Sequence, residues 1–499
     1  MIRIALPTAA LAIVMLSAGG AVGQEIVRIV SPAAVTTLDP VGSAASGNIE
    51  ALGQLYSRLL RRNDDGELEP GLAESWTVSE DGLTYTFELR EAQFSDGSPL
   101  RAEDVAFSLN RVATDPVSAY PAPFAAFAEA TAVDEDTVEV RLQYPSAPML
   151  DNLEIYNAGI VSKADVEARG ADAFSAQPVT SGPFMVQEWR PNDRLILSAN
   201  PHYWREGHPL IDGAELIEVA DANARASMIQ AGEVDVVRVV PYAQVAELDA
   251  AEGISVPLEP STVIFIVLPN HGRPPFDNLE ARRAAALALD REAITQAITL
   301  GMAETANSTM PSALKFYAAD LEGPAYDPEA ARAILEEQGL VGTEIVMLVQ
   351  PDQEQLATLL QAQWDAVGFR TRAERVDGGL WWDRLMAGDY DVTASWWYNE
   401  NEDPDLAVRW AHCGTCGSNS FYTNYNNERI NELTEAALRE SDPAAREAMY
   451  REIQQISVDE LSQIPLWYAP YVNAYSDRIT GMSLTPALQW TLEDADFAE

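Results

Sequence analysis

Basic residues are few in this 499-residue chain, and lysine is almost missing. Lys163 and Lys315 are the only lysines among 32 basic residues, whereas 77 residues are acidic, so the formal net charge is −45. A chain this acidic repels phosphate backbones, and we expect no nucleic-acid partner. The acidity has two interpretations: a solvated surface suited to a salty medium, or a field that attracts cationic solutes. Composition leaves both open.

Catalytic sequence motifs are also missing. The chain has no GxSxG elbow, HExxH pair, GxxxxGK[ST] loop or GxGxxG turn, and it has only four histidines for acid–base chemistry. A carboxylate pair for glycoside hydrolysis stays open in so acidic a chain, but no pattern places two acids opposite one another. We therefore expect a protein that is not an enzyme and needs no cofactor.

Cysteine is limited to Cys413 and Cys416, in the segment AHCGTCGSNS. In an oxidising compartment, such a pair in a loop rich in glycine and serine is most simply a small disulfide. A thioredoxin-like role would place the pair at the start of a helix, and the flanking glycines argue against it. His412 is adjacent, but the other histidines show no ligand spacing, so we expect no metal site.

Long apolar runs are confined to the N-terminus. An arginine precedes an apolar stretch from Ile4 to Leu16, which is followed by small residues ending at Gly23. This layout predicts a secretory signal peptide, residues 1–23, cleaved near Gly23, because the stretch contains Pro7 and is short for a membrane anchor. No later segment has 18 consecutive apolar residues, so we expect a soluble, exported, periplasmic protein.

The order of strand and helix patterns predicts an α/β protein with more than one lobe, since 499 residues exceed what one core usually supports. A small subdomain is expected where strands at 83–90 and 137–142 flank a helix at 102–112. A second group of strands should contain a βαβ unit, with strands at 216–219 and 234–240 around a helix at 223–231.

The second half of the chain predicts another α/β lobe. Residues 277–300 have the pattern of one long amphipathic helix, capped by Asp277 or Asn278. From residue 328 to 396 helices and strands alternate, which favours a substantially parallel sheet. Ser441-Asp442-Pro443 predicts the start of a further helix, and the run IPLWYAPYVNAY should return the chain to the other lobe.

Ten motifs carry a family resemblance. The longest is residues 68–111, LEPGLAESWTVSEDGLTYTFELREAQFSDGSPLRAEDVAFSLNR. The others, in their order along the chain, are TLDP (37–40), SGPFMVQEW (181–189), NPHYW (200–204), AGEVDV (231–236), RRAAALALDREAI (282–294), WDAVGF (364–369), GDYDV (388–392), EDPD (402–405) and QIPLWY (463–468). With these motifs the chain resembles the peptide-type, family 5 solute-binding proteins of ABC importers.

The resemblance implies a two-lobed periplasmic-binding-protein type II fold with an inserted α/β subdomain. Lobe I would comprise residues 24–58, 178–265 and 470–499, subdomain II residues 59–177, and lobe III residues 266–469. The lobes of such proteins close around a solute by hinge motion. The implied function is capture of a small-molecule or peptide solute and delivery to ABC permease transmembrane subunits, at which the protein docks; we expect a monomer.

The segment SWWYNENEDPD, residues 395–405, is the strongest candidate for solute binding. In the peptide-binding members that it resembles, an acid three residues before the Asp-Pro pair holds the solute's amino group, and Glu400 occupies that position here. A carboxylate suits an ammonium group because their hydrogen bond is charge-assisted. The alternatives are that Glu400 and Asp403 form a solvated acidic turn and that Trp396, Trp397 and Tyr398 pack in the core.

Two further features bear on the solute. Family members present the loop after the first strand to the ligand, so Thr37 and Leu38 resemble contact positions, although their polar groups could equally stabilise the loop. In relatives that hold a dipeptide at both ends, an arginine follows the strand that corresponds to residues 347–350, but here Pro351 and Asp352 follow. Oligopeptides, opines, oligosaccharides and metal chelates therefore stay open, as does a sensory receptor as the docking partner.

Overall fold

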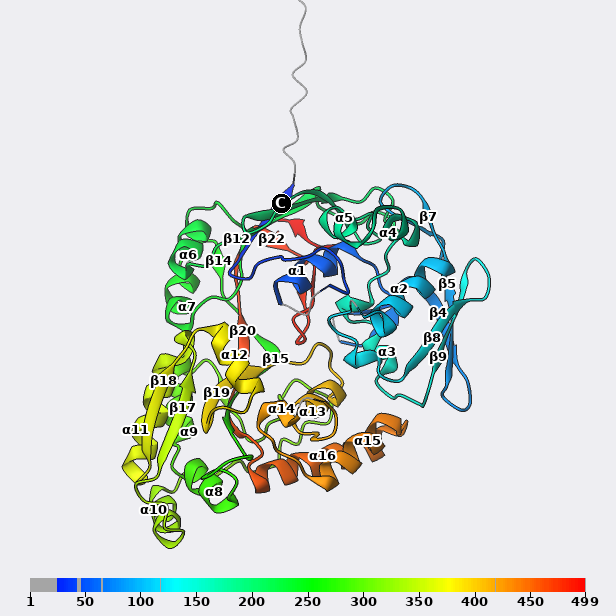
Figure 1. Cartoon of the computed structure of the whole chain (residues 1–499). Helices are drawn as coiled ribbons and strands as arrows, with labels where there is room; N and C mark the ends of the chain where they lie inside the picture. Colours follow the sequence, from blue (N-terminus) through cyan, green and yellow to red (C-terminus); the bar gives the residue numbers. More distant parts are fainter. Residues whose placement is uncertain (1–24, 43–45, 64–65, 117, 418, 499) are drawn as a thin grey trace, which may run out of the picture.

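The computed structural model describes residues 25–42, 46–63, 66–116, 118–417 and 419–498. The predicted signal peptide and its cleavage near Gly23 lie outside these described residues. Figure 1 shows an upper lobe that contains β1, a lower lobe made of the green, yellow and orange segments, and a smaller cyan body around α2. The predicted two-lobed α/β architecture with an added subdomain is confirmed.

Lobe I is built around a mixed seven-stranded sheet. Its order is β10 (Phe184–Arg190), β11 (Arg194–Ala199), β12 (Gly213–Glu218), β1 (Ile26–Ser31), β13 (Val236–Val237), β21 (Ala474–Ser476) and β14 (Ile254–Ser255). Side chains alternate between the faces of the central strand, so Ile29 and Val30 belong to hydrophobic clusters on opposite sides. The predicted βαβ unit exists, with α6 (Ala222–Gln230) between β12 and β13, but β1 lies between those two strands and is parallel to both.

Lobe III is built around a six-stranded sheet. Its order is β16 (Glu304–Thr305), β20 (Ile464–Val472), β15 (Leu258–Pro269), β19 (Val392–Trp397), β17 (Glu344–Val349) and β18 (Arg370–Arg375). The strands of residues 328–396 are parallel as predicted, but the other half of the sheet is antiparallel. β17 is parallel to β18 and to β19, whereas β15, β16 and β20 pair antiparallel because two of them carry the chain between the lobes.

The two long strands β15 and β20 connect the lobes through the middle of the molecule (Figure 1). They pair antiparallel from Leu258 opposite Val472 to Val267 opposite Ile464. β20 is followed directly by β21, which belongs to the sheet of lobe I. The predicted return of the IPLWYAPYVNAY run to the other lobe is therefore confirmed.

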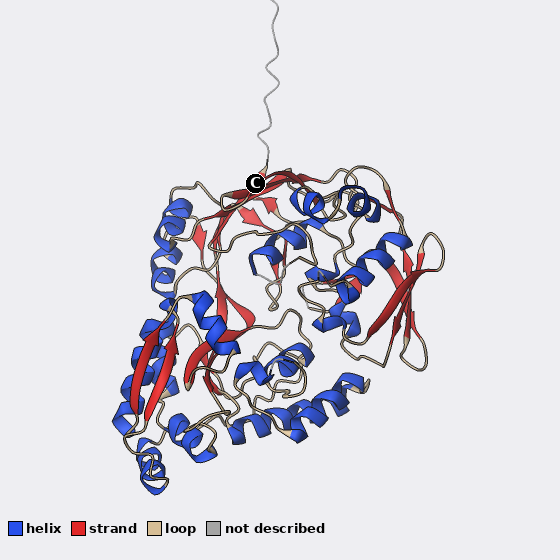
Figure 2. Ribbon diagram, in the orientation of Figure 1, coloured by secondary structure: helices blue, strands red, loops and turns tan. Residues whose placement is uncertain are grey.

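The inserted subdomain contains an antiparallel four-stranded sheet. Its order is β4 (Ala73–Val78), β5 (Thr84–Leu89), β9 (Thr137–Leu142) and β8 (Phe127–Ala132), so the predicted pairing of 83–90 with 137–142 is confirmed. Helix α2 (Ala102–Thr114) covers one face of the sheet, as Figure 2 shows. Val105, Leu109 and Val112 lie on one side of this helix and are fully buried in the subdomain core.

The remaining elements are shorter strands and the other helices. The strand pairs are β2 (Leu60–Arg62) with β3 (Leu68–Pro70), β6 (Ala92–Gln93) with β7 (Pro99–Leu100), β22 (Ile479–Thr480) with β25 (Asp496–Phe497), and β23 (Ser483–Leu484) with β24 (Trp490–Thr491). The other helices are α1 (Ser46–Leu55), α3 (Met149–Asn152), α4 (Lys163–Arg169), α5 (Ala171–Ala176), α7 (Tyr242–Asp249), α8 (Leu279–Leu287), α9 (Arg291–Thr299), α10 (Pro328–Glu337), α11 (Glu354–Val367), α12 (Gly378–Met386), α13 (Asp405–Ala411), α14 (Asn419–Tyr422), α15 (Glu428–Arg439) and α16 (Pro443–Glu460).

The prediction of a single long helix over residues 277–300 was wrong, because the segment forms two helices, α8 and α9. Asn278 caps α8 by accepting a hydrogen bond from the backbone of Glu280, as predicted. Asp290 then caps α9 by accepting from the backbone N–H of Ala293 at 2.9 Å. An aspartate that caps a second helix interrupts the first one even where the apolar periodicity continues. The predicted cap and N1 proline of α16, Asp442 and Pro443, are confirmed.

Candidate functional site

The loop that follows β19 holds Glu400 at the boundary between the two lobes. Asn399 fixes this loop: its side-chain amide donates to the carbonyls of Asn401 and Asp403, each at 2.7 Å. Its backbone N–H donates to Thr262 Oγ1 of β15 at 3.1 Å. From lobe I, the side chain of Gln489 donates to the carbonyl of Glu400 at 3.1 Å. The position of Glu400 is therefore set by both lobes.

Four tyrosines from three parts of the fold lie within electrostatic range of the Glu400 carboxylate: Tyr120, Tyr156, Tyr398 and Tyr471. Tyr120 donates its hydroxyl hydrogen bond to the carboxylate. Burial raises the pKa of Glu400 to about 7, and the hydrogen bond from Tyr120 only partly opposes that shift. Among the described residues, no arginine, lysine or histidine forms an ion pair with Glu400.

This environment has a clear chemical preference. A carboxylate without a protein cation, in surroundings that exclude much of the solvent, gains strongly from an ammonium group that donates charge-assisted hydrogen bonds. Aromatic faces nearby add a cation–π attraction for the same group. The arrangement suits a cationic amine and offers nothing comparable to an anion.

Asp403 lies three residues from Glu400 but has a different environment. It is buried, and both of its carboxylate oxygens accept hydrogen bonds from Arg446, at 2.6 and 2.9 Å. Its Oδ1 also accepts from the backbone N–H of Asp405 at 3.0 Å. The carboxylate is thus already neutralised within the protein. The acidic segment is therefore not a solvated turn, and the Asp403 carboxylate, unlike that of Glu400, already has a cationic partner.

The three consecutive aromatics of the segment divide between the two faces of β19. Trp397 is 5% exposed and lies in a hydrophobic cluster of lobe III. Trp396 is 40% exposed and stacks on Tyr398, with ring centroids 6.2 Å apart. Tyr398 contacts the cores of both lobes and adjoins Glu400. Strand alternation thus leaves Trp396 and Tyr398 as the members of the trio that a solute can reach.

The loop after β1 is held together mainly by its own polar groups. Thr37 is half-buried; its Oγ1 accepts from the backbone of Asp39 at 3.1 Å, and its N–H donates to Asn48 Oδ1 at 3.3 Å. Leu38 is fully buried, and its carbonyl accepts from the Tyr56 hydroxyl at 2.7 Å. The geometry gives Leu38 a packing role and Thr37 a loop-stabilising one.

The sequence analysis missed Tyr120, Tyr156 and Tyr471. Tyr120 and Tyr156 come from the region inserted between the strands of lobe I, far from residue 400 in the chain, and no motif marks them. Tyr471 lies on β20, in the run assigned to the return between lobes. Side chains face the boundary between the lobes where the chain crosses from one lobe to the other. Of the three tyrosines, only Tyr471 lies in a predicted crossing, so only Tyr471 could have been predicted.

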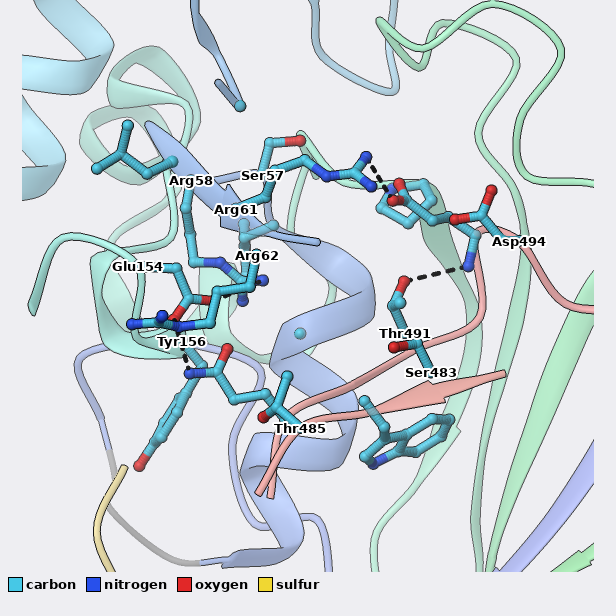
Figure 3. Close-up of a pocket in the computed structure, with 18 of the residues that line it drawn as sticks. Ser57, Arg58, Arg61, Arg62, Glu154, Tyr156, Ser483, Thr485, Thr491 and Asp494 are labelled. Carbon is cyan, nitrogen blue, oxygen red and sulfur yellow. Dashed lines mark hydrogen bonds and ion pairs between the residues drawn. The ribbon is translucent and has the colours of Figure 1, made fainter. Parts of the chain in front are cut away.

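A polar cavity of about 90 Å³ adjoins this site and shares Tyr156 and Gln489 with it. Three arginines dominate its wall, but each is matched by acids. Arg62 pairs with Asp151 at 2.5 Å and Glu154 at 3.4 Å, and Arg61 pairs with Glu493 at 2.8 Å. Figure 3 shows Arg58 and Arg62 turned toward Glu154, while the hydroxyl of Tyr156 points away from them. The cavity wall is charge-balanced, in contrast to the surroundings of Glu400.

Several side chains bridge lobe III and the inserted region. Asn401 donates to Asn152 Oδ1 at 2.9 Å, and Lys315 pairs with Asp151 at 3.1 Å. Glu402 lies 3.7 Å from Arg62. These contacts hold the loop that carries Glu400 against the opposite side of the molecule.

The two cysteines and His412 have structural roles. A disulfide joins Cys413 and Cys416, whose Cα atoms are 5.4 Å apart. Burial lowers the pKa of His412 to about 3, and its neutral ring contacts the hydroxyls of Thr309 and Ser462. Within the part of the chain that the structure describes, no cluster of His, Cys, Asp and Glu could hold a metal ion. No helix in that part is both long enough and apolar enough to span a membrane.

Comparison with known proteins identifies the family. The model for bacterial extracellular solute-binding proteins, family 5, matches residues 67–418, more than half of the chain. The chain therefore belongs to this family, and it is a solute-binding protein. Members of the family bind small solutes or peptides and work with ABC permeases, and the family is not one of enzymes.

Individual relatives agree over nearly the whole length. The glutathione-binding protein GsiB of Escherichia coli O1:K1 is 29% identical over 479 residues, covering 92% of both chains. The structure of DppA from Helicobacter pylori in complex with the peptide STSA has a TM-score of 0.83 at 23% identity, covering 94% of this chain and 99% of that one. MoaA from A. tumefacien R10, in complex with mannopinic acid, has a TM-score of 0.83 at 25% identity, covering 95% and 100%.

Proposed function

We propose that this protein is the periplasmic substrate-binding component of an ABC importer and that it captures an amine-bearing solute, preferably a peptide. The observation that carries the proposal is the Glu400 carboxylate, which lies within electrostatic range of the tyrosines and has no cationic partner among the described residues. Glu400 is half-buried, and a carboxylate that is shielded from much of the solvent and lacks a cation is costly for a protein to keep. It becomes favourable once a solute supplies the ammonium group.

The relatives support the same chemistry. GsiB is named for glutathione, and DppA was solved with the peptide STSA. Both of these solutes carry a free amino group. Opine and nickel-complex carriers share the fold, and the amine preference of the Glu400 site favours peptides over metal complexes here.

The proposed solute site comprises Glu400, Tyr398 and Trp396, joined by Tyr120, Tyr156 and Tyr471. It lies in the inter-lobe cleft that the fold implies, between a lobe I of residues 24–58, 178–265 and 470–499 and a lobe III of residues 266–469, with residues 59–177 inserted. In this proposal the signal peptide is removed near Gly23, and the mature protein is a monomer that delivers its solute by docking on the permease.

A thermal-shift screen tests the proposal. Residues 24–499 are unfolded and refolded to remove any carried solute, and then mixed with di- to pentapeptides, glutathione, opines, polyamines and sugars. Binding to the native state raises its stability, by about 2.7 kcal/mol at a hundredfold excess over Kd. We expect a selective rise in Tm with peptides that have a free amino terminus. A rise with sugars alone, or none with any amine in protein shown to be folded, would contradict the proposal.

A further inference from the structure

Arg238 is a buried arginine of lobe I that is not part of the proposed amine site. It is the first residue after β13, a strand of the lobe I sheet, and its backbone N–H donates to the carbonyl of Val30 in β1 at 2.9 Å. Ligand sites in open α/β sheets lie beyond the carboxyl ends of the strands, which is where this side chain begins. The residue is 3% exposed.

The guanidinium of Arg238 is poorly compensated for a buried cation. Its Nε has no hydrogen-bond partner in the described structure, and its nearest acid is Glu50, with Nε and Oε1 3.3 Å apart. Burial raises the pKa of Glu50 even though Arg238 opposes that shift. The two side chains therefore form an ion pair through Nε, and the two outer nitrogens of Arg238 have no acceptor among the described residues.

A second buried arginine of the same lobe shows what a purely structural role looks like. Arg225 donates from Nη1 to the carbonyls of Val219 and Ala220, at 2.9 and 2.8 Å, and from Nη2 to the carbonyl of Val239 at 2.9 Å. Both outer nitrogens of Arg225 are thus satisfied by the backbone, although its Nε, like that of Arg238, has no hydrogen-bond partner among the described residues. Arg238 makes no comparable set of bonds to described residues, so its fork is left for another acceptor.

Tyr471 connects Arg238 to the amine site. Burial is the main cause that raises the pKa of the Tyr471 hydroxyl, while Arg238 lowers it and Glu400 raises it. The Tyr471 hydroxyl therefore lies within electrostatic range of both the Arg238 guanidinium of lobe I and the Glu400 carboxylate of lobe III. On its other side Arg238 faces Trp490, with the guanidinium carbon 5.7 Å from the ring centroid. Trp490 follows Gln489, whose side chain donates to the carbonyl of Glu400 at 3.1 Å, so Arg238 lies against the segment that contacts the amine site.

We infer that Arg238 binds a carboxylate of the solute, so that a zwitterionic solute is held by its amine at Glu400 and by its carboxylate at Arg238. This inference rests on the proposed function and narrows its substrate class. A guanidinium suits a carboxylate because two parallel N–H groups match the two oxygens. It also supplies an anion site in a chain that has Pro351 and Asp352 where a lobe III arginine was expected.

Because the two anchors lie on different lobes, a solute that binds both affects the closure of the lobes. The amine anchor belongs to the loop after β19 in lobe III, and the carboxylate anchor follows β13 in lobe I. A solute that carries both groups contacts both lobes, and it stabilises the closed form over any form in which the lobes are apart. A solute that lacks either group holds one lobe only.

The test uses a tripeptide library prepared in three forms: free acids, C-terminal amides and N-acetylated acids. Each form is offered in competition to the stripped mature protein, and the bound species are read by native mass spectrometry. The unaltered protein should retain free acids at least tenfold over amides. Replacing Arg238 alone would leave Glu50 buried without its cationic partner. The informative variant is therefore the double change Arg238→Gln with Glu50→Gln. Its matched control is Glu50→Gln alone.

We expect Glu50→Gln to keep the preference for acids, and the double variant to hold acids and amides alike while still rejecting N-acetylated forms. A double variant that still prefers acids would overturn the role of Arg238 and leave the amine site intact. Equal binding of N-acetylated and free forms by the unaltered protein, or binding of no tripeptide, would instead overturn the proposed function.

Discussion

The turn after β19 carries two carboxylates, Glu400 and Asp403, that differ in whether a cation of the protein pairs with them. Asp403 receives two hydrogen bonds from Arg446 and is 1% exposed. Glu400, three residues earlier, has tyrosines within electrostatic range, and burial raises its pKa to about 7. One acid has been neutralised by the fold and the other has been left without a cation.

The difference distinguishes an acid with a structural role from the acid that we propose binds the solute. A buried carboxylate paired with arginine contributes to a specific packing arrangement, and its charge is unavailable to a solute. A buried carboxylate without a cation destabilises the free protein and so gains most from a solute that supplies the missing charge. A similar contrast distinguishes Arg225, whose two outer nitrogens donate to backbone carbonyls, from Arg238, whose outer nitrogens make no such bonds to described residues.

The largest effect on stability is expected at the paired end of the turn. Asp403→Asn leaves Arg446 buried without its acid, which should lower the free energy of unfolding by about 3 kcal/mol. Solute affinity of the folded protein should stay unchanged, because Asp403 faces Arg446. Urea unfolding and calorimetry measure the two quantities. Glu432→Gln, an exposed acid on α15 paired with Arg429 at 3.4 Å, is the control and should cost less than about 0.5 kcal/mol. A large loss of affinity in folded Asp403→Asn would contradict the comparison.

A pH profile of binding should sharpen the comparison next. With its pKa raised to about 7, Glu400 is mostly protonated below that pH in the free protein and cannot pair with an ammonium group. Affinity for an amine solute should therefore rise by about tenfold from pH 6 to pH 8 and level off above. The same profile measured on Glu400→Gln should be flat over this range.

Stability of the solute-free protein should change in the opposite direction. Because the folded-state pKa of Glu400 lies above the unfolded value of 4.5, the native state holds the extra proton, and its stability falls as pH rises through about 7. Burial also raises the pKa of Asp405 to about 7, which adds a contribution of the same sign. Subtracting the Glu400→Gln profile isolates Glu400. A difference profile that is flat, or that rises with pH, would contradict this assignment.

The smallest effect is expected at the disulfide. Cys413→Ser with Cys416→Ser opens a loop of only four residues, so the loss of stability should not exceed about 2 kcal/mol. For a chain of this size, such a loss corresponds to a decrease in Tm of about 2 °C. Solute affinity should be retained. Abolished binding in the folded double variant would show that the loop contributes to the solute site.

The sequence predicted the strands and helix ends that depend on residues only a few positions apart. The strand at 137–142 and the start of α16 at Pro443 were predicted because alternation, turn residues and caps act within a few positions. The break between α8 and α9 was missed because the apolar period continues on both sides of Asp290, which caps α9. The antiparallel half of the lobe III sheet depends on crossings between lobes, which periodicity does not encode.

The candidate site was predictable only in part. Glu400 was found from its spacing to the Asp-Pro pair, but its tyrosine neighbours Tyr120 and Tyr156 are distant in sequence and are brought near by the tertiary fold. The partner of Asp403 is Arg446, 43 residues away, so its neutralisation could not be read from the turn. Charge compensation is a property of the assembled structure, and it is what distinguishes the two acids.

The most direct test of Glu400 as the amine anchor is isothermal titration of the mature protein and of Glu400→Gln with one tripeptide selected from the library, in its free and N-acetylated forms. Acetylation should weaken binding to the unaltered protein by at least about 30-fold, which corresponds to the loss of one buried charge pair. Glu400→Gln should bind both forms equally and weakly. If acetylation costs the same affinity in both proteins, the solute's amine is not held by Glu400.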